Sequence, residues 1–233
     1  MGLLGKQERS TSAEVATKAL YNAIVDGVIE PGSFLRLQDL SDQLSMSMMP
    51  VREAIRELAS LGLVEMIPHR GAQVRPLDLK DLVDTYRARL YLETRVLRVA
   101  VPKFGEKDAR AARDALDQRA IAYAQGDAVT ARAAHERFHF AIYRAADNEW
   151  LVNAITPGWR NSERYRSSSM RLTNVRERHD SEHQALLDAM SNHDAEQSVR
   201  ILYGHLASAA NSVANQLAGK DIWAELPAVE ELL

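Results

Sequence analysis

Two short amphipathic segments with only a few residues between them constrain the fold of this chain more than any other feature. Residues 37–44 and 50–58 each have the length of two to three helical turns, and Ser47 and Pro50 suit the start of the second helix. The apolar residues that recur at helical spacing are Leu37, Leu40 and Leu44 in the first segment and Val51, Ile55 and Leu58 in the second. Two short helices joined by a tight turn predict a helix-turn-helix.

The residues that follow this motif predict a β-hairpin. Gly62 is suited to end the second helix, and residues 64–67 alternate between apolar and polar side chains as a strand does. Residues 69–71 then form a turn, and residues 72–74 run back along the first strand. A hairpin in this place is the wing of a winged helix-turn-helix.

The opposite face of the second helix carries Arg52 and Arg56, one turn apart, on a helix small enough to enter the major groove of DNA. An alternative is that both are surface charges paired with Glu53 and Glu57. The chain has a net charge of −3, and its first 76 residues hold eight basic and nine acidic side chains. DNA binding therefore requires a localised basic face and two copies of the protein, because the general electrostatic attraction is small.

The chain of 233 residues is long enough for two domains. A helix that Ser12 caps and that ends near Asp26 completes a first domain over residues 1–76. Few prolines and glycines and 46% apolar residues favour helices in the second domain, residues 79–218. The expected helices are roughly 79–101, 106–125, 128–145, 150–170, 174–192 and 195–217, with a kink or split at Pro157-Gly158 in the fourth. Residues 219–233 form a tail that either folds back or stays disordered.

The composition also limits the cellular compartment that we expect and the chemistry that the side chains can perform. The chain has no cysteine, which excludes a disulfide framework, a thiolate metal site and a thiol nucleophile. Its apolar runs are too short for a membrane span, and its start lacks the pattern of a signal peptide. We therefore expect a cytoplasmic protein without a membrane partner.

The helix-turn-helix region resembles the winged helix-turn-helix of GntR-family transcription regulators. The resemblance lies in residues 47–55 (SMMPVREAI), 61–64 (LGLV) and 70–74 (RGAQV). It implies that double-stranded DNA is contacted by Gln38, Ser47, Met48, Met49, Arg52, Arg56, Arg70 and Gly71. The chain departs from the family at Met48, where an arginine usually reads a guanine, and at Met49, where threonine is common. The guanine contact therefore does not carry over to this position.

Four of the seven histidines stand at positions from which a helical bundle can bring them together. His135 and His139 lie one turn apart on one expected helix, and His183 and His205 lie on two others. Neutral imidazoles from three helices suit Zn²⁺, Ni²⁺ or a similar borderline cation, with positions left for water or a carboxylate. Spacing leaves alternatives open, because helical histidines are often ordinary surface or core residues and His179 with His183 has the same spacing.

The second domain resembles the FCD domain, the ligand-binding half of FadR-like GntR regulators. The matching segments are residues 135–139 (HERFH), 147–151 (DNEWL), 182–183 (EH) and 205–206 (HL). The resemblance covers about residues 15–217 and implies a divalent metal held by His135, His139, His183 and His205. Metal-binding members of the group have aspartate at the position of His135, and imidazole can replace carboxylate for a borderline metal.

Arg89 is the candidate for binding an effector. FCD domains commonly carry an inward arginine at this position, where it grips the carboxylate of a small effector in bidentate fashion. The alternative is a surface ion pair with Glu93, four residues on, worth a few tenths of a kcal/mol. The remaining arginines in this part of the chain are interpreted as a solvated face or loop; they are Arg160, Arg164, Arg166, Arg171, Arg176 and Arg178.

These features predict a mainly α protein, with an N-terminal winged helix-turn-helix and a C-terminal all-helical, FCD-like antiparallel bundle. The predicted function is ligand-responsive transcription regulation: a homodimer binds a pseudo-palindromic operator, and a small carboxylate at the metal site shifts the recognition helices. One alternative is a metal-dependent hydrolase or lyase, because a histidine site with open positions can activate water. Its only nearby base, Glu136, points to a different side of the helix. Another alternative is a DNA-binding scaffold whose bundle only dimerises.

Overall fold

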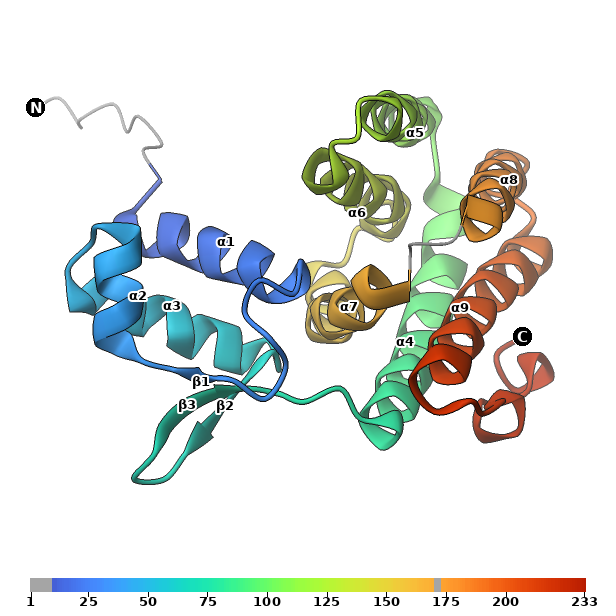
Figure 1. Ribbon diagram of the computed structural model, residues 1–233. Coiled ribbons are helices and arrows are strands. Elements are labelled where there is room, and N and C mark those ends of the chain that lie inside the picture. Colours follow the sequence, from blue (N-terminus) through green and yellow to red (C-terminus); the bar gives the residue numbers. More distant parts are fainter. Residues whose placement is uncertain (1–9, 170–172) are drawn as a thin grey trace, which may run out of the picture. The chain divides into compact units, whose positions relative to one another are not determined.

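The computed structural model describes residues 10–169 and 173–233, and the chain divides after Pro76 into two compact units (Figure 1). Side chains are described for these residues except 168–169 and 173–179. The elements of the first unit are α1 (Ser12–Val25), β1 (Phe34–Leu35), α2 (Leu37–Leu44), α3 (Met48–Ser60), β2 (Val64–Ile67) and β3 (Gly71–Val74). This is the predicted order of helix, helix-turn-helix and hairpin.

The first unit differs from the expectation in three local details. Thr11, and not Ser12, caps α1, because its hydroxyl accepts from the backbone N–H of Glu14 while the Glu14 carboxylate accepts from that of Thr11. Helix α3 begins at Met48, and Ser47 occupies the cap position without a capping hydrogen bond from its side chain among the described residues. Strand β1, which no pattern indicated, pairs with β3 and gives the sheet the order β1-β3-β2.

The core of the first unit fixes which face of α3 is left for other contacts. Helix α1 packs on α3, and the apolar stripe of α3 is closed against α1 and the sheet. The stripe residues Val51, Ala54 and Leu58 are fully buried and Ile55 nearly so. Because 3.6 residues make a turn, Arg52 and Arg56 then point away from this core and are exposed.

The second unit is helical throughout its described length, apart from its turns. Its elements are α4 (Leu79–Ala100), η1 (Val101–Lys103), α5 (Glu106–Ala124), α6 (Ala128–Arg144), α7 (Glu149–Ser169), α8 (Thr173–Ser191), α9 (Ala195–Ala218), η2 (Trp223–Glu225) and η3 (Val229–Glu231). Asp127, Asn148 and Asp194 cap the helices that follow them, because a side-chain oxygen of each accepts from a backbone N–H in the first turn. Helix α7 is continuous across Pro157, so of the expected kink or split the split does not occur.

The bundle core is built from aromatic and aliphatic side chains of α4, α6, α7, α8 and α9. Its largest buried members include Tyr86, Phe138, Tyr143 and Trp159. Figure 1 shows α4 in green and α9 in red running alongside each other through this core. No helix in the described part of the chain has the length and apolar character needed to cross a membrane.

The C-terminal tail folds back onto the bundle. The backbone N–H of Ile222 donates to the Asn211 side chain at 2.8 Å, and Asp221 accepts from the amide groups of Asn211 and Asn215. Ile222 and Leu226 are buried as a result. Of the two outcomes that the sequence left open, the structure shows the folded one.

Candidate metal centre and DNA-binding surface

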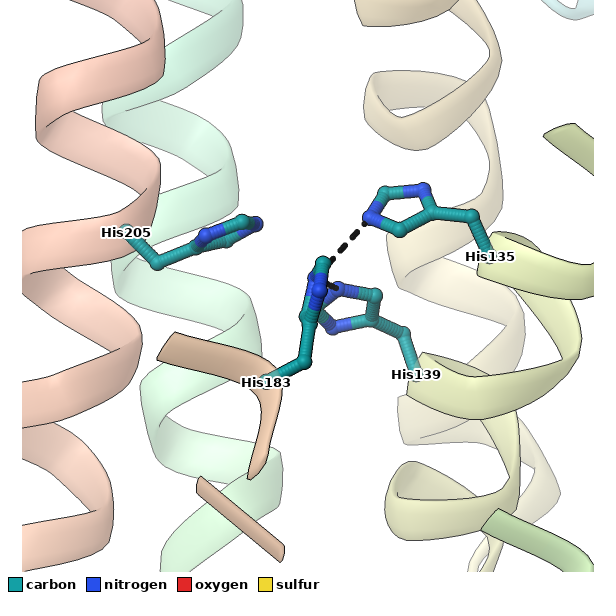
Figure 2. Close-up of side chains that lie close together, drawn as sticks. All are labelled: His135, His139, His183 and His205. Carbon is teal, nitrogen blue, oxygen red and sulfur yellow. Dashed lines mark hydrogen bonds between the residues drawn. The ribbon is translucent and has the colours of Figure 1, made fainter. Parts of the chain in front are cut away.

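Four histidine side chains meet inside the bundle (Figure 2). His135 and His139 come from α6, His183 from α8 and His205 from α9, and one ring nitrogen of each lies within 4.8 Å of the others. The Nε2 atom of His183 is 3.1 Å from Nε2 of His139 and 3.2 Å from Nε2 of His135. The structure therefore brings together the four residues that the sequence singled out. The side chain of His179 lies outside the described residues.

The spacing of these nitrogens fits a small divalent ion. In a tetrahedral zinc site each nitrogen lies about 2.0–2.1 Å from the metal, so neighbouring ligand nitrogens are about 3.3 Å apart. The two nitrogen–nitrogen distances at His183 are close to this value. A set made only of imidazole nitrogens suits borderline cations such as Zn²⁺ and Ni²⁺.

Two of the rings are oriented by acceptors behind them. Nδ1 of His205 is 2.8 Å from a carboxylate oxygen of Glu182, so this nitrogen carries the proton and Nε2 keeps its lone pair. Tyr143 donates to Glu93 at 2.6 Å, so its oxygen accepts from Nδ1 of His139 at 3.2 Å. Nε2 of His139 is then also free of a proton. Both tautomers are those that a metal ligand needs.

The ring of His135 is held differently. Nη1 of Arg166 lies 3.4 Å from its Nδ1, and because a guanidinium only donates, Nδ1 must accept. A neutral ring then carries its proton on Nε2, the atom that faces His183. Ligation by His135 therefore requires Arg166 to release Nδ1. This is the position at which metal-binding relatives were expected to have aspartate.

The protonation states of the site follow from its burial. His139, His183 and His205 are at most 4% exposed. Burial lowers the pKa of His135 and His139 well below the ordinary imidazole value, and the positive charge of Arg166 adds to this. Burial also lowers the pKa of His205, although the Glu182 carboxylate opposes the shift. The rings of His135, His139 and His205 are therefore neutral at pH 7, the state that binds metal.

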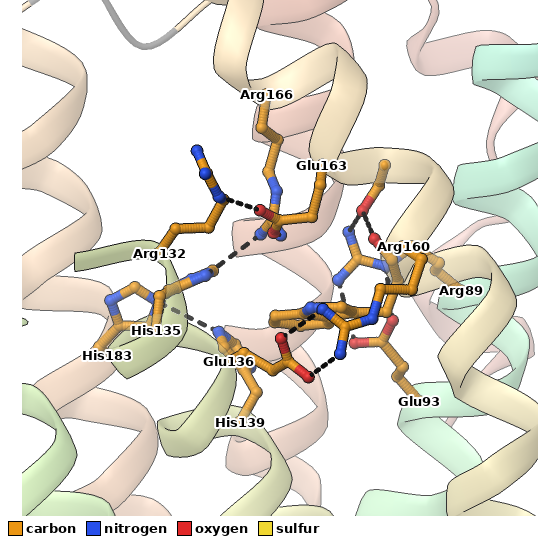
Figure 3. Close-up of polar contacts among 12 residues, drawn as sticks. Arg89, Glu93, Arg132, His135, Glu136, His139, Arg160, Glu163, Arg166 and His183 are labelled. Carbon is orange, nitrogen blue, oxygen red and sulfur yellow. Dashed lines mark hydrogen bonds and ion pairs between the residues drawn. The ribbon is translucent and has the colours of Figure 1, made fainter. Parts of the chain in front are cut away.

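Arg89 is buried beside this cluster, with 1% of the residue exposed (Figure 3). Its Nε and Nη2 donate to the two carboxylate oxygens of Glu93 at 2.6 and 3.3 Å, and its Nη1 donates to the Ser162 hydroxyl at 3.0 Å. The guanidinium lies 4.9 Å from the ring centre of Trp159, which stacks on His135. Glu93 is thus the partner of Arg89, as one interpretation of the sequence had it, but the pair is buried and not on the surface.

The glycine next to Pro157 has a packing role here. A Cβ at Gly158 would lie 3.2 Å from Cγ of Arg89, closer than most real contacts. Gly158 therefore allows Arg89 to lie against α7.

The interpretation of the α7 arginines as a solvated face is wrong for those that the structure describes. Arg164 and Arg166 are 3% and 8% exposed, and Arg160 forms two hydrogen bonds of 2.7 Å with the Glu136 carboxylate. Arg166 pairs with Glu163 and lies over Trp159 (Figure 3). The side chains of Arg171, Arg176 and Arg178 lie outside the described residues.

Three residues whose side chains orient the site were not among the predicted site residues: Glu93, Tyr143 and Glu182. Tyr143 follows His139 by four residues and Glu93 follows Arg89 by four, so helical spacing contained a signal for both. Glu182 reaches His205 from a different helix, and no spacing within one helix indicates such a contact.

The eight residues predicted to contact DNA are all exposed in the first unit; they are Gln38, Ser47, Met48, Met49, Arg52, Arg56, Arg70 and Gly71. An open groove of 710 Å³ runs between α3, β1 and the wing, and four arginines line it: Arg36, Arg52, Arg56 and Arg70. Sequence reasoning missed Arg36, which precedes α2. Among the described residues, Arg52 and Arg56 form no ion pair with Glu53 or Glu57, and Glu57 instead accepts from the Thr17 hydroxyl.

Comparison with known proteins decides the family. The model described as "Bacterial regulatory proteins, gntR family" matches residues 12–74, and the FCD domain model matches residues 84–208. The probable D-xylose utilization operon transcriptional repressor of Paenarthrobacter nicotinovorans is 32% identical over 216 residues, which are 91% of this chain and 93% of that protein. The chain belongs to the GntR family. The predicted family and mainly α fold class are thereby confirmed.

Other GntR relatives agree with this assignment. The uncharacterized HTH-type transcriptional regulator BphR of Paraburkholderia xenovorans is 30% identical over 207 residues, 86% of this chain and 84% of that protein. The structure of McbR/YncC from E. coli covers 90% of this chain and 100% of its own, with a TM-score of 0.77 and 23% identity, which shows the fold. This GntR-family chain thus carries a DNA-binding domain and an FCD domain, and the D-xylose operon repressor and BphR are both named as transcription regulators.

Proposed function

We propose that this GntR-family protein is a ligand-responsive transcription regulator that binds a pseudo-palindromic operator as a homodimer in the cytoplasm. Its effector is a small carboxylate, bound beside a divalent metal in the FCD domain. The observation that carries the proposal is the convergence of four histidine nitrogens within 4.8 Å, in a chain with a GntR DNA-binding domain. The identity of its relatives as regulators favours this function over a metal-dependent hydrolase or lyase.

The metal would be held by His139, His183 and His205, with His135 as a fourth ligand once Arg166 releases it. Zn²⁺ or Ni²⁺ is the expected ion, since each accepts a set of neutral imidazoles. When bound, it would supply a positive charge and would accept a carboxylate oxygen either at the fourth tetrahedral position, in place of His135, or as a fifth ligand beside the four histidines. Glu182 and Tyr143 keep the lone pairs of two rings directed at the ion.

Arg89 would bind the other end of the effector. Glu93 and Ser162 take three of its five N–H groups, and the Nε–Nη2 edge that suits a bidentate carboxylate is held by Glu93. Because only 1% of Arg89 is exposed, the effector binds a rearranged site in which the polar group at this other end competes with Glu93 for the guanidinium. Such a rearrangement gives the effector different affinities for two states of the protein, and regulation requires this difference.

The proposed recognition helix leads to a direct prediction. We expect Arg52→Ala and Arg56→Ala to weaken operator binding by about 1–3 kcal/mol each and to relax base preference locally, because each removes a guanidinium from the exposed face of α3. Fluorescence anisotropy with a labelled operator measures the affinity. Arg110→Ala, which removes an exposed arginine from α5, is the matched control. Unchanged affinity in both α3 variants would exclude α3 as the recognition helix.

The function as a whole is tested with the full chain. An operator is first selected from random double-stranded DNA, and its affinity is then measured for metal-loaded protein with gluconate, malate, succinate, glutamate and D-xylose. We expect one carboxylate to change the affinity for the operator, and sedimentation to show two chains on each duplex. Failure to enrich any sequence would contradict operator binding. An operator affinity that none of the carboxylates changes would contradict the proposed class of effector.

A further inference from the structure

We propose that Met48 and Met49 read thymine methyl groups in the major groove, so that each operator half-site carries A·T pairs where the first turn of α3 enters. This inference rests on the proposed binding of an operator through α3. It goes further, because it assigns two specificity-determining residues and the base that they prefer.

The first observation is that both methionines are exposed. Met48 is 47% and Met49 64% exposed, although methionine is normally a buried residue. They occupy the first two positions of α3, and Arg52 follows them by four and three residues, so the three side chains share one face. Met48 and Met49 thus lie on the exposed face of α3 together with Arg52, and they are not part of the core of this unit.

The second observation is the charge of a neighbouring groove, which Arg52 lines but Met48 and Met49 do not. Arg36, Arg52, Arg56 and Arg70 line the groove between α3, β1 and the wing. The first 76 residues have nine acidic and eight basic side chains, so these arginines form a local cationic surface on a domain with no positive excess. A polyanion fits this surface better than an apolar protein partner or a lipid does.

The chemistry of the major groove then selects the base. Methionine has no hydrogen-bond donor and only a weak acceptor, so it cannot reproduce the bidentate contact of an arginine with guanine. The C5-methyl group of thymine is the apolar feature that base pairs present in this groove. Burying one methyl group against a methionine changes the affinity about fourfold.

The experiment compares thymine with uracil, which differs only in lacking this methyl group. Sites are selected from random duplex DNA with the full-length protein, and each thymine of a selected site is replaced singly by uracil. We expect an approximately fourfold loss of affinity at one or two positions in each half-site. Met48→Ala and Met49→Ala should each abolish the loss at one position, whereas Arg52→Ala should weaken binding and leave the uracil effect in place.

A gain of function completes the test. We expect Met48→Arg to select guanine at the position that Met48 reads and to discriminate against other bases by about five- to 150-fold. If uracil is tolerated at every position of a tightly bound site, or if its effect persists in both alanine variants, the methionines do not read methyl groups. If no sequence is enriched at all, operator binding fails together with this inference.

Discussion

Zn²⁺ should raise the unfolding midpoint of the helical unit of chelator-stripped protein by about 5–10 °C. At a free metal concentration of a hundred times Kd, binding to the folded state alone contributes about 2.7 kcal/mol. For a domain of this size each kcal/mol corresponds to about 2–4 °C. The proposed ligands come from α6, α8 and α9, so a bound ion would link three helices and oppose their separation. Differential scanning calorimetry with and without Zn²⁺ measures the shift.

His183→Ala should remove most of this shift, because Nε2 of His183 lies at 3.1–3.2 Å from the Nε2 atoms of two other proposed ligands, His135 and His139. His193→Ala is the control. Its Nδ1 bonds to the backbone oxygen of Val101, outside the cluster, so this variant loses an imidazole but keeps the shift. Equal shifts in the two variants would contradict the proposed site.

Removal of the metal should separate the two activities of the protein. We expect chelation to abolish the influence of a carboxylate effector on operator affinity and to leave operator binding partly intact. The reason is that the proposed metal ligands belong to the second unit, whereas the proposed DNA contacts belong to the first. Anisotropy titrations before and after chelation measure both quantities. An effector response that survives chelation would show that the metal is not part of the effector site.

Glu93→Ala should lower the free energy of unfolding by about 3–5 kcal/mol, because it leaves the Arg89 charge buried without its carboxylate. Arg89 and Glu93 are 1% and 0% exposed, and their closest contact is 2.6 Å. The substitution also removes the acceptor of the Tyr143 hydroxyl. Chemical denaturation of metal-free protein measures the loss without a contribution from the metal.

The same helix supplies a matched control for this substitution. Asp84 pairs with Lys80 four residues earlier in α4, at the same spacing, but both side chains are exposed. Asp84→Ala should therefore leave the denaturation midpoint almost unchanged. In addition, the double variant Arg89→Ala/Glu93→Ala should lose less stability than the sum of the two single variants, because no unpaired charge remains. Additive losses would show that the two side chains do not act as a pair.

Much of the fold could be predicted because local patterns and tertiary packing agree. The helices of the bundle begin at capping residues such as Asp127 and Asp194, whose spacing from the next apolar stripe is visible in the sequence. Strand β1 was missed because two residues carry no periodicity, and it exists only through pairing with β3. The cap of α1 was assigned to Ser12 although Thr11 satisfies the capping box with Glu14.

The candidate metal site likewise depends on contacts between helices, which a pattern within one helix does not predict. Helical spacing placed His135 and His139 on one face, but only the tertiary arrangement of the bundle brings His183 of α8 and His205 of α9 to them. Arg166 gave no such signal, since a charged residue on a helix is usually exposed, and its burial depends on Glu163 and Trp159. The burial of the Arg89–Glu93 pair likewise follows from α7, not from the spacing within α4.

The proposal that the histidine cluster holds one divalent metal ion is tested most directly by elemental analysis of the purified, dialysed protein. We predict about one equivalent of zinc or nickel per chain in the parent and in His193→Ala, and a large loss in His183→Ala. A parent protein that contains no metal and takes up none from a solution of Zn²⁺ or Ni²⁺ would contradict the proposal.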